Sequence, residues 1–356
     1  MRIVDVSKLK GNEILGKQIF DDTGRVLLNE GIKLTPFYIE RLKSLGVISI
    51  YVDDEISKEV VIEESISEKT RQKSKIAVKD MIDKYCREGK TDNSGVLKSV
   101  NSVIDDVLSN KSVMVNVSEI RSKDNNIYSH SVNVCVLSTI IGIHMGYNML
   151  RVKDIAMAAI LHDIGKVRIK NDNKTLSQYK NSQELEKFIK ETHPRVAYDF
   201  LGQENICSVH SKVAVLMHHE KVDGSGYPLG IKGKEISEIA KIISVCNVFD
   251  NLISSNDKDE GRPVYEAIEY LIGMSNIYFD AETVKKFSVN IAAFPTGSGV
   301  LLNSNEKCLV VKQNKGMPMR PIVKVIYDRE GKKVLKPYEI DLLKQLTLFI
   351  EKSCQI

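Results

Sequence analysis

The chain lacks the features of several protein classes. Its 356 residues contain no apolar run approaching the roughly twenty residues that span a membrane, and the richest stretch, 132–143, is short and interrupted by polar residues. The amino terminus lacks the apolar core and cleavage site of a signal peptide. Neither sign of charge dominates, since 51 basic residues oppose 47 acidic ones and leave a net charge of +4. That balance argues for neither a nucleic-acid polymer nor a membrane surface as the partner.

Paired cysteines are also absent. The six cysteines are scattered singly, without the C-x-x-C spacing of zinc or redox sites. Several lie in apolar stretches with helical spacing, where a reduced cysteine acts as a small hydrophobic residue. We therefore expect reduced thiols and a cytoplasmic protein.

Five histidines and one carboxylate form the most informative pattern in the chain. His162 and Asp163 are adjacent in LHDIGK, His218 and His219 open HHEKVDGSGYP, and two further histidines complete the set, His130 and His193. Imidazoles and a carboxylate suit iron, manganese or zinc better than magnesium or calcium, which prefer oxygen ligands. An adjacent His-Asp pair is unusual for a structural site, which more often uses cysteine. The pattern predicts metal-assisted hydrolysis.

Six ligands are more than one metal usually takes from a protein while leaving room for substrate. The economical arrangement is two metals bridged by Asp163 and a hydroxide, which places them roughly 3.5–4 Å apart. The loop after His219 adds glycines, which permit close backbone approach to a ligand. Its Tyr227 offers a stacking face for a nucleobase. Two other histidines, His144 and His210, match no further pattern and are expected to be packed or exposed.

The chain divides by pattern into four segments. The first, residues 1–55, predicts a small α+β unit with a hairpin at 18–28 and a helix that Thr35 caps and Pro36 begins. Residues 56–120 form a charged, helical connector. Residues 121–290 are helical almost throughout.

Within the helical segment, we expect one helix to end at Gly165 and another to have Pro194 in its first turn. The last segment, 291–356, predicts strands at 300–302, 308–312 and 322–327. It is expected to close with an amphipathic helix over 337–352.

Motifs over residues 121–290 resemble the HD-GYP proteins, a bacterial subgroup of the HD phosphohydrolase superfamily. In the family's order they are YSHSVNV, AAILHDIGKVRI, ETHPRVAYDFL, HHEKVDGSGYPLGIKGKEIS, AKIISVCNVFD and YFDAETV. The terminal segments also resemble domains that flank this one in relatives. The resemblance implies a mainly α fold, in which an HD-GYP helical bundle is flanked by a small α+β domain and a small β-rich extension. It also implies metal-dependent hydrolysis of cyclic di-GMP to pGpG or GMP.

The resemblance further implies roles for single residues. The expected metal ligands are His130, His162, Asp163, His193, His218, His219 and, where the family has Asp, Asn247. Asp163 and Lys166 match catalytic positions, and Lys166 is also expected to face the substrate phosphate. The remaining substrate-binding positions are those of the loop named for the family, Gly224, Gly226, Tyr227 and Pro228. The implied cofactors are two divalent ions, iron or manganese ahead of zinc.

Three departures from the family leave alternatives open. Asn247 carries no charge, SSNDKDEGRP replaces a basic phosphate-holding segment, and Asn126 replaces a glutamate that holds a third metal in some relatives. We therefore expect at most two metals. One alternative is a degenerate cyclic di-GMP sensor or protein-interaction module without turnover. Another is a hydrolase of a different cyclic dinucleotide. The helical stretch 76–110 is a candidate surface for a homodimer or a signalling partner.

Overall fold

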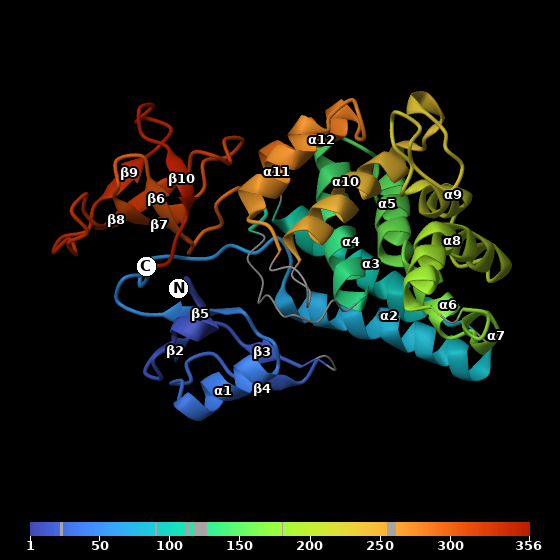
Figure 1. Cartoon of the computed structure of the whole chain (residues 1–356), viewed down its shortest axis with the longest axis horizontal. Helices are drawn as coiled ribbons and strands as arrows, with labels where there is room; N and C mark the ends of the chain where they lie inside the picture. The colour runs from blue at the N-terminus through green and yellow to red at the C-terminus, as the bar shows by residue number, and fades with distance from the viewer. Residues whose placement is uncertain (22–23, 90, 111–113, 117–126, 180, 255–260) are drawn as a thin grey trace.

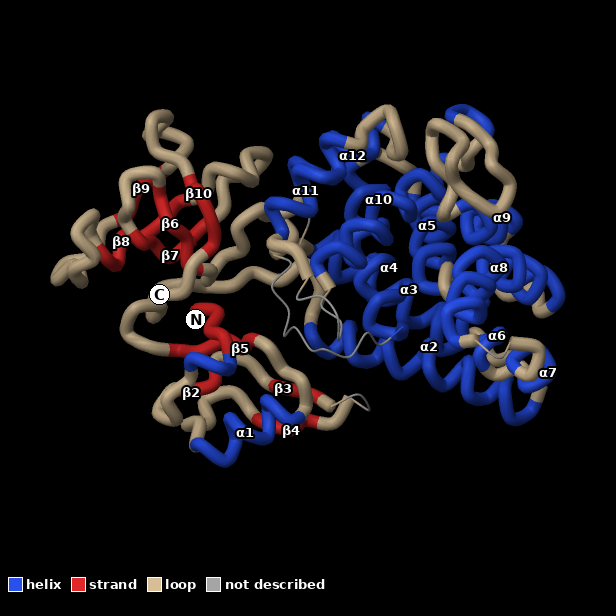
Figure 2. The backbone as a smooth tube through the Cα atoms, in the orientation of Figure 1, coloured by secondary structure: helices blue, strands red, loops and turns tan. Residues whose placement is uncertain are grey.

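The structure is a computed structural model that describes residues 1–21, 24–89, 91–110, 114–116, 127–179, 181–254 and 261–356. Figure 1 shows an N-terminal unit at lower left, a helical body at right and a β-rich extension at upper left. Coloured by secondary structure, the strands gather in the two left-hand parts and most helices in the body (Figure 2). The prediction of a mainly α fold with small sheets at both ends is confirmed.

The N-terminal unit is built around the short strand β5. Its elements are β1 (Arg2–Asp5), the 3₁₀ turn η1 (Val6–Lys8), β2 (Ile14–Leu15), β3 (Ile19–Phe20), β4 (Val26–Leu28), α1 (Pro36–Ser44) and β5 (Ser49–Asp53). Strand β5 lies between β1 and β2 and is antiparallel to both. Strands β3 and β4 form the predicted hairpin, although turn residues 22 and 23 lie outside the described residues. The Thr35 hydroxyl accepts a hydrogen bond from the Tyr38 amide at 3.3 Å and caps α1 as expected.

The helical body follows. Its elements are α2 (Glu68–Glu88), α3 (Ser94–Ser109), α4 (Ile127–His144), α5 (Met149–Leu161), α6 (Ile164–Lys170), α7 (Asn173–Leu176), α8 (Ser182–Gln203), α9 (Val209–Met217), the 3₁₀ turn η2 (Gly233–Glu235), α10 (Glu238–Ile253), α11 (Val264–Gly273) and α12 (Ala281–Asn290). Helix α2 begins inside the charged connector, where the Ser67 hydroxyl caps it by accepting from the Thr70 amide at 3.2 Å.

The predicted helix end at Gly165 is wrong. Helix α5 ends at Leu161, and Gly165 lies inside the next helix, α6. A Cβ at this position would stand 2.0 Å from the carbonyl oxygen of His193 in α8. The glycine is therefore needed for the close approach of two helices rather than for a helix stop.

The extension is a five-stranded antiparallel sheet in the order β10-β6-β7-β8-β9. Its strands are β6 (Gly299–Leu302), β7 (Lys307–Lys312), β8 (Ile322–Tyr327), β9 (Glu339–Asp341) and β10 (Ile350–Ser353). The first three agree with the strands expected from the sequence.

The helix predicted over 337–352 is wrong. Two of the leucines that suggested an apolar helix face, Leu343 and Leu346, are 39% and 69% exposed. The backbone of this segment is satisfied instead by pairing of β9 with β8 and of β10 with β6. Between the two strands, the Arg320 guanidinium donates to the carbonyls of Leu342 at 3.0 Å and Leu348 at 3.2 Å.

One cluster of buried apolar side chains fills the helical body and continues into the extension, where it includes Val300, Cys308 and Val323. The N-terminal unit has a separate cluster, to which Leu15, Leu34 and Leu42 belong. All six cysteines are free thiols.

Among the described residues, one helix is long and apolar enough to cross a membrane, judged by length and composition alone. It is α4, and 61% of its window is buried inside the protein. Its buried residues belong to the large apolar cluster of the helical body, which is the environment of a core helix.

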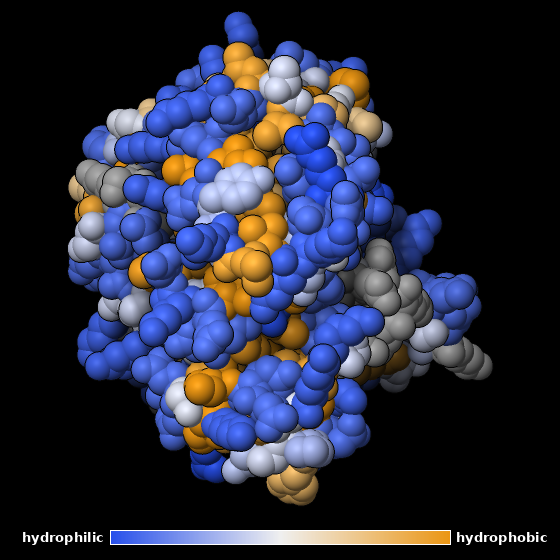
Figure 3. Space-filling view, turned by 90° about the vertical axis from the view of Figure 1, so that its left-hand side faces the viewer, coloured by the Kyte–Doolittle hydropathy of each residue, from blue (hydrophilic) through white to orange (hydrophobic). Residues whose placement is uncertain are grey.

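Figure 3 shows the face that carries the extension above and the N-terminal unit below. Hydrophobic residues appear there between hydrophilic ones.

Candidate metal centre

The carboxylate of Asp163 lies between two groups of histidines. Its Oδ2 atom is 3.5 Å from His162 Nε2 and 3.7 Å from His130 Nε2. Its Oδ1 atom is 3.2 Å from His193 Nε2 and 3.9 Å from His218 Nε2. The potential ligand atoms form two sets, within each of which all atoms lie within 4.8 Å of one another. The first set is His130, His162 and Asp163. The second set is Asp163, His193, His218 and His219. Six of the seven residues predicted as metal ligands therefore converge, with Asp163 common to both sets.

Helix ends position most of these side chains. His130 lies in the first turn of α4, His162 and Asp163 join α5 to α6, and the last two histidines directly follow α9. The Nδ1 atom of His162 lies 2.7 Å from the Ala159 carbonyl, and that of His218 lies 2.6 Å from the Val215 carbonyl. Donation from Nδ1 to the backbone leaves Nε2 as the lone-pair nitrogen, and it orients Nε2 toward the centre, as in metal-binding histidines.

The prediction that Pro194 lies in the first turn of a helix is wrong, because α8 runs through it from Ser182 to Gln203. Proline has no amide hydrogen to donate to the carbonyl four residues earlier, that of Lys190. The Nδ1 atom of His193 lies 2.9 Å from this carbonyl oxygen and 3.0 Å from that of Ile189. The side chain of His193 therefore compensates for the proline, and the same contact points its Nε2 toward Asp163.

Burial sets the charge of these groups. It lowers the pKa of His162 to about 4 and holds the pKa values of His218 and His219 well below the usual range, so all three are neutral near pH 7. Burial opposes ionisation of Asp163, but His162 and Lys166 hold the pKa of this carboxyl well below its usual value. The result is a buried anion beside three neutral imidazoles, those of His162, His218 and His219.

Two polar atoms of this centre, Asp163 Oδ1 and His219 Nε2, are buried without a hydrogen-bond partner among the described residues. Buried polar atoms are normally satisfied, so such a pair needs an explanation. Imidazole nitrogens and a carboxylate are ligands for first-row divalent metals. The residues present therefore fit a divalent cation.

Asn247 lies at the His130 side of the centre. It is 1% exposed, and its Oδ1 atom is 3.0 Å from His130 Nε2. Asp250, one turn further along α10, lies behind the same imidazole, with Oδ2 2.7 Å from His130 Nδ1. Burial opposes protonation of His130, but the hydrogen bond and charge of Asp250 raise its pKa. Asp250 therefore orients His130, while the uncharged Asn247 occupies the position nearer the centre.

Lys166 and the glycine-rich loop border the centre. Lys166 Nζ is 2.7 Å from Asp163 Oδ2, and the Tyr227 ring stacks on His219 with centroids 4.6 Å apart. A Cβ at Gly226 would stand 2.4 Å from the Lys221 amide nitrogen, so this glycine lets the loop fold onto the chain's own backbone. Gly224 has a φ of +84°, a conformation that favours glycine. Pro228 follows Tyr227 through a cis peptide bond.

The sequence did not single out Glu220. It is 2% exposed, and its Oε1 accepts a hydrogen bond from the Leu229 amide at 2.6 Å, which ties the loop down. The only feature of the sequence that could have indicated a role for Glu220 is its position directly after His218 and His219.

The other expectations fall outside the centre or outside the described residues. His144 bonds the Ile140 carbonyl through Nδ1, and the side chain of His210 is 67% exposed, as expected. Asn126 and most of the SSNDKDEGRP segment lie outside the described residues.

Comparison with known proteins gives matches to two families of domains. Residues 114–283 match the HD domain, and residues 299–356 match a KOW domain associated with HD domains. A solved structure described as an HDG"Y"P protein from Bdellovibrio bacteriovorus superposes with a TM-score of 0.50 at 17% identity, covering 80% of this chain and 97% of its own. That likeness concerns the fold.

Curated relatives carry more specific names. A cyclic di-GMP phosphodiesterase of Pseudomonas aeruginosa is 27% identical over 68% of this chain and 58% of its own length. A 3'3'-cGAMP-specific phosphodiesterase of Vibrio cholerae is 26% identical over 50% of this chain and 38% of its own. The chain thus spans less than two thirds of either relative. The chain thus matches the HD domain over residues 114–283 and is similar to curated cyclic di-GMP phosphodiesterases.

Proposed function

We propose that the protein is a metal-dependent phosphodiesterase that hydrolyses cyclic di-GMP to pGpG or GMP with two divalent ions. The observation that carries this proposal is the placement of Asp163, whose two carboxylate oxygens face two different groups of histidines. A carboxylate shared between two sets of nitrogen ligands suits a pair of metals rather than one. Curated relatives named as cyclic di-GMP phosphodiesterases support the substrate class.

The proposed ligands of the two ions follow the two groups of histidines on either side of Asp163. His130, His162 and Asn247 would hold one ion, His193, His218 and His219 the other, and Asp163 both. Metals bound there supply Lewis acidity for the phosphate and a nucleophilic hydroxide at neutral pH. All three of iron, manganese and zinc accept imidazole and carboxylate ligands. Iron and manganese, ahead of zinc, are the metals that we propose.

The chain's own residues bind and orient the substrate. Lys166, now paired with Asp163, has an ammonium group at the edge of the centre that would balance charge developing on a phosphate oxygen. Gly224, Gly226, Tyr227 and Pro228 would form the substrate side of the site. Glu220 would hold this loop in place through its bond to the Leu229 amide.

The domain boundaries and location belong to the same proposal. We infer an N-terminal domain over 1–55, a helical connector over 56–120, the catalytic domain over 121–290 and the extension over 291–356. The separate apolar cluster of the N-terminal unit and the two family matches support these divisions. We propose a cytoplasmic location, with cyclic di-GMP as ligand and a homodimer or a signalling protein as partner.

The test is a turnover assay on purified protein loaded anaerobically with Fe(II) and, separately, with Mn(II). Cyclic di-GMP is added and the products are separated by chromatography. We expect pGpG or GMP, lost in His162→Ala and retained in His144→Ala, a matched histidine outside the centre. Intact substrate with both metals would contradict the proposal.

Two alternatives have observations in their favour. The uncharged Asn247 favours a cyclic di-GMP sensor without turnover, which would bind the nucleotide in metal-free protein as well as in loaded protein. The similarity to a 3'3'-cGAMP-specific enzyme favours a different cyclic dinucleotide. Including 3'3'-cGAMP in the same assay separates the two alternatives. A hydrolase of a different cyclic dinucleotide gives products from 3'3'-cGAMP and none from cyclic di-GMP, whereas a sensor gives products from neither.

A further inference from the structure

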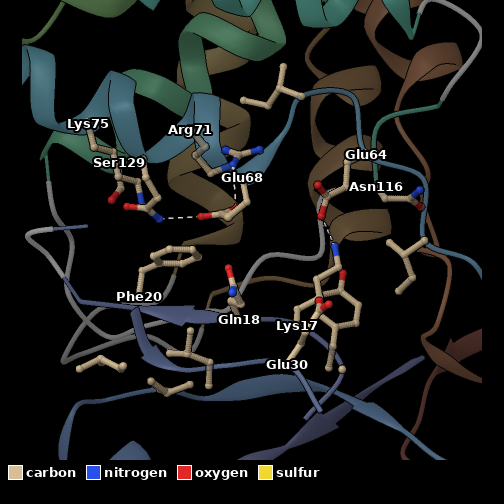
Figure 4. Close-up of a pocket in the computed structure, with 18 of the residues that line it drawn as sticks. Lys17, Gln18, Phe20, Glu30, Glu64, Glu68, Arg71, Lys75, Asn116 and Ser129 are labelled. Carbon is tan, nitrogen blue, oxygen red and sulfur yellow. Dashed lines mark hydrogen bonds and ion pairs between the residues drawn. The ribbon is translucent and has the colours of Figure 1, made fainter. Parts of the chain in front are cut away.

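A cavity of about 610 Å³ lies between the N-terminal unit, helix α2 and the first turn of α4. Figure 4 shows Lys17, Gln18 and Phe20 reaching into it from the N-terminal unit, and Lys75 and Arg71 from α2. It shares no lining residue with the metal centre. Its volume is in the range of small-molecule sites.

One wall of the cavity carries a row of cations. Arg71, Lys75 and Lys79 all line it. They are spaced four residues apart in α2 and therefore share one face of the helix, where like charges destabilise each other unless an anion balances them. Arg41, near the end of α1, adds a fourth cation from the N-terminal unit.

Five carboxylates also line the cavity, namely Asp21, Glu30, Glu63, Glu64 and Glu68, so the excess of cations is confined to the wall formed by α2. Glu64 pairs with Lys17, and Glu68 accepts from Gln72 at 2.6 Å and lies 3.7 Å from Arg71. For Lys75 and Lys79, no carboxylate lies within ion-pair distance in the described part of the chain. The face that α2 presents to the cavity therefore suits an anion.

The cavity also has apolar surface. The Phe20 ring lies at its lower wall in Figure 4, and Leu27 and Ile66 contribute further apolar lining. A bare inorganic anion would leave this surface unused. An organic anion with an aromatic part would contact the cations through its charge and the Phe20 ring through its plane.

A chain of hydrogen bonds connects the cavity to the metal centre. Arg71 Nη1 donates to Asn133 Oδ1 at 2.8 Å, and Asn133 Nδ2 donates to Asp250 Oδ1 at 3.1 Å. The other oxygen of Asp250 contacts His130 Nδ1 at 2.7 Å. A ligand that moved Arg71 would therefore change the group that orients His130.

We propose that this cavity binds a small organic anion with an aromatic part, and that Arg71 couples its occupancy to His130 through Asn133 and Asp250. Arg71, Asn133 and Asp250 are positioning residues in this scheme. The binding step is independent of the proposed function, whereas the coupling step rests on the proposed metal centre.

Binding is tested by fluorescence titration of the metal-free, full-length protein with anilinonaphthalene sulfonate, an aromatic anion. We expect saturable binding of one equivalent. The double variant Lys75→Ala, Lys79→Ala should bind about tenfold more weakly, because each lysine supplies a charge-assisted contact. The matched double variant Lys69→Ala, Lys73→Ala removes two exposed lysines of the same helix and should bind like the wild type. Equal binding by the two double variants would overturn the proposal.

Coupling is tested by measuring Mn²⁺ affinity with and without the same sulfonate. The wild type should show a change of roughly fivefold or more, typical of linked sites. Asn133→Ala should keep sulfonate binding and lose the change. An Mn²⁺ affinity that is the same with and without sulfonate overturns the coupling. Absence of any Mn²⁺ binding instead counts against the metal centre and leaves the sulfonate result to be judged separately.

Discussion

At the scale of single residues, Asn247 is the residue on which the proposed activity depends. Its Oδ1 atom accepts from Asn251 Nδ2 at 2.8 Å as well as lying 3.0 Å from His130 Nε2. The amide therefore presents an oxygen to the centre, as a carboxylate would, but without negative charge. Asp250 cannot take its place, because its carboxylate is held behind His130 by bonds to that imidazole and to Asn133.

Asn247→Asp should strengthen metal binding, because it adds an anionic oxygen at a position that already faces the centre. We expect Mn²⁺ affinity to rise on the order of tenfold, the scale on which residues around a metal act. Equilibrium dialysis with metal analysis measures this. Asn12→Asp is the control, since it adds the same charge at an exposed side chain of the N-terminal unit and should leave Mn²⁺ affinity unchanged. Unchanged Mn²⁺ affinity in Asn247→Asp would show that this residue is not a ligand.

Gly226→Ala should destabilise the loop beside the centre. The added Cβ would meet the backbone of residues 219–221 at 2.4–2.5 Å, and backbone cannot rotate away as a side chain can. We expect a cost of about 1–3 kcal/mol, as for other overpacked sites. Gly273→Ala is the matched control, because nothing lies within 4 Å of its added Cβ at the end of α11. Urea unfolding midpoints compare the two, and equal shifts would contradict the tight packing of Gly226.

Residue types at the centre were predictable, because the ligand preferences of a metal restrict them to imidazole and carboxylate. Their partners were not. Asn133 and Glu220 act only through tertiary contacts, and ordinary polar residues at those positions give no signal in a single sequence. Tyr227 was predicted as a nucleobase platform, yet the structure stacks it on His219, a contact that depends on how the loop folds.

At the scale of elements, helix-breaking residues were the main source of error. Pro194 was expected near a helix start, but the His193 side chain satisfies the carbonyl that proline leaves free, so α8 continues. Gly165 was expected at a helix end, but it permits close contact with α8. Helix starts with a capping side chain, such as Thr35 before Pro36, were predicted correctly because the cap is local.

Arg320 holds the segment between β9 and β10 from the connection between β7 and β8. Arg320→Met removes the donor to the carbonyls of Leu342 and Leu348 and should destabilise the extension by about 1–3 kcal/mol, because these acceptors lose their partner. Lys315→Met removes an exposed cation from the connection between β7 and β8, to which Arg320 also belongs, and should leave stability almost unchanged. Faster proteolytic cleavage within 342–349 and a lower urea midpoint, in Arg320→Met alone, are the expected results. Equal resistance of both variants to proteolysis would mean that strand pairing alone holds the segment between β9 and β10 in place.

At the scale of the whole molecule, the helical body and the extension share one apolar cluster, while the N-terminal unit has its own. Val115 of the connector lies where the helical body meets the extension: its amide donates to the Asn290 carbonyl and its carbonyl accepts from the Ala292 amide. This arrangement was beyond the reach of sequence patterns, since it depends on contacts between residues far apart in the chain. Periodicity shows that an element has an apolar face, but not which other element covers it.

Metal binding should therefore stabilise the extension together with the helical body. A ligand present at 100 times its dissociation constant adds about 2.7 kcal/mol to the state that binds it. Because one core runs through both parts, we expect Mn²⁺ to slow hydrogen exchange in α5 and α8 and also in β6 and β7. Strand β5 of the N-terminal unit, which belongs to a separate core, should exchange at an unchanged rate. The His162→Ala variant, measured in the same way, should show no effect of Mn²⁺ on any segment. Slower exchange confined to the helices would show that the extension unfolds independently of the metal-binding part, despite the continuous core.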